Sequence, residues 1–253
     1  MTFAQTAIAA VLVAAASAAT AAPAFLVTYE AAGVTNSTAT FSTKGVETFN
    51  SRTAGLNQTF TSNFGGMSGA NPISGTYTNV DIAGQDQYGG AGGTYALTST
   101  NTASSAKYSL TLSSTAPVTY FGFWLSALDA GNELKFFSGS TQVFSFSPTE
   151  VLALTGNCST GSTNPYCGNP STRQNPGQPY VFLNFFAENG TTFDKIEFSE
   201  TVSNSGYESD NHTVGRFLTT SGTALNSVPE PGSLALLGLG LVGLAAARKR
   251  KSA

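Results

Sequence analysis

The sequence predicts an all-β protein, a jelly-roll-like antiparallel β-sandwich, between an N-terminal and a C-terminal targeting segment. Within residues 23–227, short stretches alternate between apolar and polar residues, as half-buried strands do. Gly, Asn, Ser and Pro separate these stretches, and such residues mark turns. Only 10% of the residues are charged and 11% are aromatic, a composition that argues against a disordered chain. No linker divides the segment, so we expect one extracellular domain.

The first predicted strands are residues 25–30 and 76–82, which alternate. Residues 107–112 alternate most clearly. Residues 118–125 are almost all apolar, which predicts a central strand buried on both faces. The remaining predicted strands are residues 133–139, 141–147, 180–187 and 193–200.

Two tight turns and one helical turn complete the predicted elements. Residues 137–140 connect two strands, and Asn189-Gly190 carries the hairpin signal of a two-residue turn. Residues 148–154 contain the only hint of a helix.

Charge excludes one class of function. The chain has 11 basic and 14 acidic side chains, and four of the basic ones lie together at residues 248–251. The rest of the chain is therefore acidic. A nucleic-acid-binding protein needs a basic face to neutralise phosphates, so we expect no nucleic-acid partner.

Residues 1–22 are predicted to be a secretory signal peptide. An apolar run over residues 7–16 is followed by small residues, and Ala19-Thr20-Ala21 fits an A-x-A site for signal peptidase, with cleavage after Ala21. The usual basic residues before the apolar run are missing. The alternative is a buried Ala-rich helix, which is disfavoured because the segment has no polar face to show to water.

The C-terminal residues 228–253 have three parts. Pro229, Glu230 and Pro231 precede an apolar helix predicted over residues 233–247, which would rise only ~22 Å. A hydrocarbon core is ~30 Å thick, but terminal basic side chains can extend to the interface and close part of this gap. The positive-inside rule keeps the basic tail in the cytoplasm. That tail consists of Arg248, Lys249, Arg250 and Lys251.

This order of parts resembles the PEP-CTERM sorting signal of exosortase-dependent bacterial surface proteins. The resemblance implies that a membrane-embedded exosortase recognises residues 229–231, removes the helix, and releases or relocates the body from the inner membrane to the cell surface or medium. Such proteins are typical of bacteria that make extracellular polysaccharide. The alternative is a permanent single-pass anchor. The segment 118–147 resembles hairpins of many such proteins, and residues 85–93 and 207–215 resemble one subfamily, without an assigned activity.

Cys158 and Cys167 lie nine positions apart in the longest irregular segment, residues 156–179. An exported chain meets an oxidising compartment, so this even pair predicts a disulfide. A metal pair or a redox pair is the alternative. Two thiolates without a neighbouring His make a poor zinc site, and the spacing differs from that of a C-x-x-C redox motif.

Glu47 and Asp210 are candidate ligands of a structural calcium ion, the only cofactor that the sequence suggests. Calcium prefers carboxylate, amide and carbonyl oxygens. In carbohydrate-binding jelly rolls such an ion often uses a Glu of an early strand and an Asp near the start of the last strand. The alternative is that Asp210 and Asn211 form an Asx turn before that strand.

Catalytic signals are weak. His212 is the only His, no G-x-S-x-G elbow is present, and we expect His212 at a turn or strand edge. Glu197 and Glu200 offer a carboxylate pair but are expected to be solvated. Trp124 is predicted to pack in the core. Two tyrosines among glycines are expected to be exposed and able to stack on sugars, namely Tyr88 and Tyr95.

Two functions remain open at this stage. The first is a non-enzymatic protein of the cell surface, extracellular matrix or biofilm, with a structural or polysaccharide-associated role. The second is a secreted carbohydrate-active enzyme that uses the same export route. An enzyme should have a cleft lined by converging carboxylates.

Overall fold

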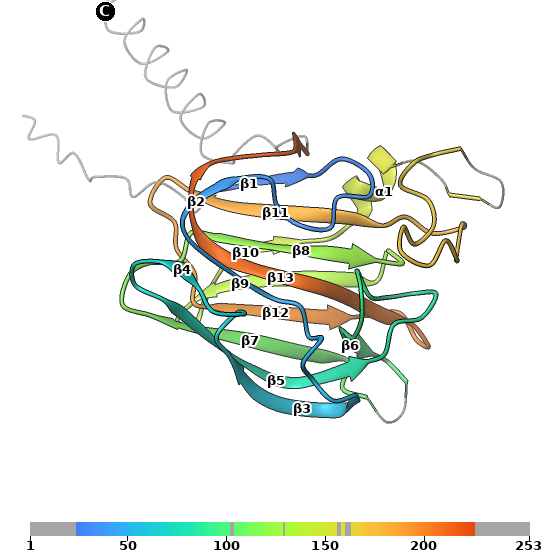
Figure 1. The fold of residues 1–253 in the computed structure, drawn as a ribbon, viewed down its shortest axis with the longest axis horizontal. Helices are drawn as coiled ribbons and strands as arrows, with labels where there is room; N and C mark the ends of the chain where they lie inside the picture. Colours follow the sequence, from blue (N-terminus) through green and yellow to red (C-terminus); the bar gives the residue numbers. More distant parts are fainter. Residues whose placement is uncertain (1–23, 102–103, 129, 156–157, 160–162, 226–253) are drawn as a thin grey trace, which may run out of the picture.

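The computed structural model describes residues 24–101, 104–128, 130–155, 158–159 and 163–225. In these residues the chain forms one antiparallel sheet of 14 strands and a single short helix (Figure 1). The prediction of an all-β fold is therefore confirmed.

The elements follow the chain from the N-terminal to the C-terminal end of the body. In order, they are β1 (Ala24–Tyr29), β2 (Thr40–Glu47), β3 (Gly55–Ser62), β4 (Ser68–Gly69), β5 (Ile73–Ala83), β6 (Tyr95–Ser99), β7 (Lys107–Ser114), β8 (Tyr120–Ser126), β9 (Asn132–Ser138), β10 (Thr141–Phe146), α1 (Thr149–Thr155), β11 (Val181–Glu188), β12 (Lys195–Glu200), β13 (Gly206–Thr219) and β14 (Thr223–Ala224).

The sheet curls so that its two halves face each other. The main path runs β10-β9-β12-β7-β5-β6-β13-β8-β11-β1-β14, and β6 joins the halves by pairing with β5 on one side and β13 on the other. Aromatic rings from the two halves meet in the core: the ring centroids of Phe121 on β8 and Phe198 on β12 are 6.0 Å apart. The two layers thus belong to one continuous sheet, and the finer jelly-roll-like description stays a prediction.

The central strands β8 and β11 are buried along almost their whole length. Their inner faces, including Phe121 and Phe123, join the main hydrophobic core. Their outer faces are covered as well, because Tyr120 and Trp124 belong to two smaller buried clusters. This confirms the central strand predicted from the apolar run and the core position of Trp124.

Local signals placed the turn and the helix correctly. Asn189 and Gly190 have φ angles of 52° and 77°, as the predicted two-residue hairpin requires. The helix α1 coincides with the predicted helical turn. Two strands were not predicted, β3 and β6, because their sequences are short of the bulky apolar residues by which a strand is recognised.

Candidate ligand-binding cleft

A cleft of about 380 Å³ opens at the end of the body where β6 and β13 begin to pair. Its walls come from the Gly-rich loop between β5 and β6, from β6 itself, and from the connection between β12 and β13. The side chains that line it include two carboxylates, Asp86 and Glu208, and the ring of Tyr88. Three amides also contribute, Asn101, Gln178 and Asn204. Its lining contains no Lys or Arg.

Asp86 shapes the Gly-rich loop. Its Oδ1 atom accepts hydrogen bonds from the backbone N–H of Tyr88 at 2.8 Å and of Gly89 at 3.0 Å, which is an Asx-type turn. The hydroxyl of Tyr95 donates to the same oxygen at 3.3 Å. A side chain at position 89 would collide with the Tyr95 ring, so the close approach of this loop requires glycine.

The two tyrosines of this loop have different environments. Tyr88 is 43% exposed, as predicted, and its ring faces the cleft opening. Tyr95 is only 2% exposed, so the prediction of an exposed ring is wrong. Its ring lies beneath the glycines, and burial together with the nearby Asp86 and Glu208 carboxylates raises its pKa. Tyr95 therefore supports the loop, and only Tyr88 is free to stack on a ligand.

Neighbouring segments fix the back of the loop. The Tyr180 hydroxyl donates to the backbone oxygen of Gln87 at 2.7 Å. Ser171 Oγ donates to the oxygen of Ala91 at 2.9 Å, and the N–H of Ala91 donates to Asp210 Oδ2 at 2.7 Å. Because three contacts restrain the loop, the cleft is largely preformed.

The predicted calcium ligands lie close in the fold but are already engaged. Glu47 accepts hydrogen bonds from Phe49 N at 2.8 Å and Ser62 Oγ at 2.6 Å, and it pairs with Arg52 at 2.6 Å. Asp210 accepts one backbone N–H on each oxygen, from Ala91 and Asn211. Within the described residues, no cluster of three or more acidic, His or Cys side chains could hold a metal ion. Calcium binding stays a prediction.

Asp210 does not form the alternative Asx turn before the last strand. It lies inside β13, next to a bulge at which Asn211 has a φ of 49°. Burial raises the pKa of Asp210 to about 7, while its two backbone hydrogen bonds act in the opposite direction.

His212 lies in the core rather than at a turn or strand edge. Its Nδ1 atom is 3.0 Å from the Tyr77 hydroxyl, and its Nε2 atom is 3.0 Å from Ser209 Oγ. The ring stacks on Phe198 with centroids 5.1 Å apart. Burial lowers the pKa of His212 to about 3. Ser209 and His212 are spaced like a nucleophile and its base, but both are 0% exposed, so a substrate cannot reach them.

The carboxylate pair on β12 also differs from expectation. Glu197 lies between Lys107 and Lys195, at 3.6 and 3.7 Å. Glu200 is 3% exposed, although we expected it to be solvated, and it accepts a hydrogen bond from Asn132 at 2.7 Å. The pair does not line the cleft.

Comparison with known families bears on the C-terminal residues. Residues 227–251 match the family model of the PEP-CTERM protein-sorting motif. The chain carries a PEP-CTERM sorting signal. This motif implies processing by an exosortase, export and a surface location. No curated protein and no solved structure matched the chain.

Several predicted parts of this PEP-CTERM protein lie outside the described residues. They are the signal peptide with its cleavage site at Ala21, the sorting motif 229–231, the helix 233–247 and the basic tail 248–251. Among the residues that the structure describes, no helix has the length and apolar character needed to cross a bilayer.

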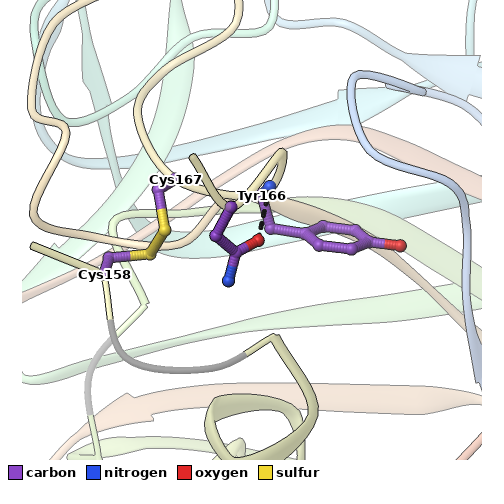
Figure 2. Close-up of a disulfide and its surroundings, with 4 residues drawn as sticks. Cys158, Tyr166 and Cys167 are labelled. Atoms are coloured by element: carbon purple, nitrogen blue, oxygen red, sulfur yellow. Dashed lines mark hydrogen bonds between the residues drawn. A yellow bond between two sulfur atoms is a disulfide. The ribbon is translucent and has the colours of Figure 1, made fainter. Parts of the chain in front are cut away.

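The predicted disulfide of the PEP-CTERM protein is present. Cys158 and Cys167 are bonded, and Figure 2 shows Tyr166 beside them, with its N–H donating to Asn164 Oδ1 at 3.0 Å. Cys167 also pairs with Pro179 in an isolated bridge. The disulfide therefore braces the segment that leads to Gln178 and the cleft.

Sequence reasoning missed most of the cleft. It identified Tyr88, because a tyrosine among glycines is hard to bury. It gave no role to Asp86 or Glu208, since 14 acidic residues are present and nothing local distinguishes these two. The Asp-x-x-Gly order of an Asx turn is the one signal that could have indicated Asp86.

Proposed function

We propose that this protein is a non-enzymatic, polysaccharide-associated component of the cell surface or extracellular matrix, delivered by the exosortase route. The PEP-CTERM motif at residues 227–251 carries the export part of this proposal. In the proposed sequence of events, signal peptidase removes residues 1–21 and the C-terminal helix holds the body transiently in the inner membrane. Exosortase then separates the body from the helix.

The cleft supports the proposed association with sugars. The half-exposed ring of Tyr88 offers a face on which a sugar ring can stack. The amides of Asn101, Gln178 and Asn204 and the two carboxylates can exchange hydrogen bonds with sugar hydroxyls. The cleft volume of about 380 Å³ lies within the usual range for small-ligand sites, ~300–1,000 Å³.

The charge of the cleft favours one class of polysaccharide. Two carboxylates and no basic side chain line it, so a uronate or sulfated chain would be repelled. A neutral sugar, or one with a free amino group, is electrostatically compatible. We therefore propose a neutral or amino-bearing polysaccharide as the ligand.

Binding to polysaccharides tests this function directly. The purified body should be retained by an immobilised neutral or partly deacetylated hexosamine polymer and not by a polyuronate. Tyr88→Ala should weaken retention roughly 3–10-fold, the value of one aromatic contact. Leu218→Ala is the matched control, because Leu218 is 65% exposed and does not line the cleft. Equal retention of both variants would contradict the proposed site.

A secreted carbohydrate-active enzyme is the second candidate. One observation favours it: Asp86 and Glu208 line the same cleft, and paired carboxylates hydrolyse glycosides. Release of reducing ends from a bound polymer, abolished by Glu208→Gln, would establish the enzyme. Binding without release in the wild type would support the non-enzymatic function.

The export route is tested by intact mass. A form recovered from the medium and ending near Pro229–Pro231 would support sorting and cleavage. A form found only in membranes that retains residues 248–251 would indicate a permanent anchor.

A further inference from the structure

The two ends of the body lie side by side on one edge of the sheet. β14 pairs with β1 in antiparallel register, with Ala224 opposite Thr28. The N–H of Leu225 donates to the backbone oxygen of Val27 at 2.9 Å, and Leu225 is only 3% exposed. Beyond Leu225 the chain therefore heads toward the end of the body at which Ala24 begins β1.

The cleft lies at the opposite end of the strands. β11 starts at Val181, three residues after the cleft residue Gln178, and ends at Glu188, which pairs with Ala24. Seven steps along this strand span roughly 24 Å. Figure 1 shows the same arrangement, with β6 at the right-hand end of the body and the start of β1 toward the left.

The connection between body and sorting motif is short. Four residue steps separate Leu225 from Pro229, which is at most about 14 Å of extended chain. Eight steps separate Leu225 from Ser233, where the apolar segment begins, at most roughly 29 Å. Pro229 and Pro231 restrict this connection to extended conformations. A body wider than its tether has little freedom to turn over.

We propose that the membrane-tethered precursor stands on the end of the body formed by Ala24, the 188–191 turn and Leu225, and presents the cleft away from the membrane. Exosortase then meets this end of a folded body, because the motif is within about 14 Å of it. The cleft is accessible to extracellular polysaccharide before cleavage. This inference rests on the proposed C-terminal anchor.

Energy transfer to the membrane tests the orientation. The full-length, uncleaved protein is placed in liposomes that contain an acceptor-labelled lipid, and a donor dye is attached to one introduced cysteine. Thr192→Cys marks the end near Ala24, and Ser203→Cys marks the cleft end, next to Asn204. Both positions lie in connections that flank β12, so they form a matched pair. The native cysteines are bonded to each other and do not react.

We expect clearly higher transfer from position 192 than from position 203. Equal or reversed transfer would overturn the proposed orientation. A flexible insertion of 20 Gly and Ser residues after Ser227, with an r.m.s. span of about 25 Å, should reduce the difference. A difference that this insertion leaves unchanged would overturn the role of the short tether. Protein that does not stay with the liposomes would refute the anchor, and the orientation with it, while the binding assay above would still test the cleft.

Discussion

Replacing Asp210 by Asn should change how the stability of the body depends on pH. Asp210 is 1% exposed, and burial raises its pKa from 3.8 to about 7. The folded state therefore holds a proton that the unfolded state releases, so the contribution of Asp210 is fully present below pH 3.8 and is lost as pH rises to about 7. A difference of about three pH units corresponds to roughly 4 kcal/mol.

His212 acts in the opposite direction over the same range. Burial lowers its pKa from 6.5 to about 3, so its contribution is present above pH 6.5 and is lost as pH falls. Between pH 4 and 6.5 the two groups largely cancel in the wild type. Asp210→Asn removes one of them, so the free energy of unfolding of the variant should rise by about 1.4 kcal/mol per pH unit in this window.

The assay is denaturant unfolding of both proteins from pH 4 to pH 8. The informative quantity is the free energy of unfolding of the wild type minus that of the variant, because all other titrating groups cancel in it. This difference should fall by roughly 4 kcal/mol between pH 4 and pH 8. Asp194→Asn, in an exposed turn, controls for the loss of one formal charge. A difference independent of pH would refute the reasoning about Asp210.

Two further variants test the scaffold. Replacing both Cys158 and Cys167 by Ser opens a ten-residue loop and should lower the free energy of unfolding by ~2.5 kcal/mol, measured by denaturation; an unchanged midpoint would contradict this. Phe198→Ala removes a ring that stacks on Tyr108 and His212 and should cost about 3–5 kcal/mol, whereas Phe217→Ala, a half-buried control, should cost less in the same thermal melt.

Local features of the sequence were sufficient for several elements. The apolar run of β8, the Asn189-Gly190 turn and the spacing of Cys158 and Cys167 each express a constraint within a few neighbouring residues. Such constraints can be recognised without knowing the partner strand. The same holds for the sorting signal, which is defined by the order of its parts.

Other expectations failed because they depended on distant partners. Tyr95 lies among glycines and yet is buried, since its ring packs beneath the loop that those glycines form. His212 follows two polar residues, but a bulge in β13 and the curl of the sheet place it between Tyr77 and Ser209 in the core. Neither environment has a signature in the adjacent sequence.

The sequence by itself determined the all-β class, the disulfide and the export signal, because alternation, cysteine spacing and segment order are properties of neighbouring residues. Only the tertiary structure decided that Asp86 and Glu208 line one cleft, and that Ala24 and Leu225 meet at the other end of the body. The physical reason is strand register. Alternation shows which face of a strand is apolar, but pairing between strands far apart in the chain fixes which side chains converge.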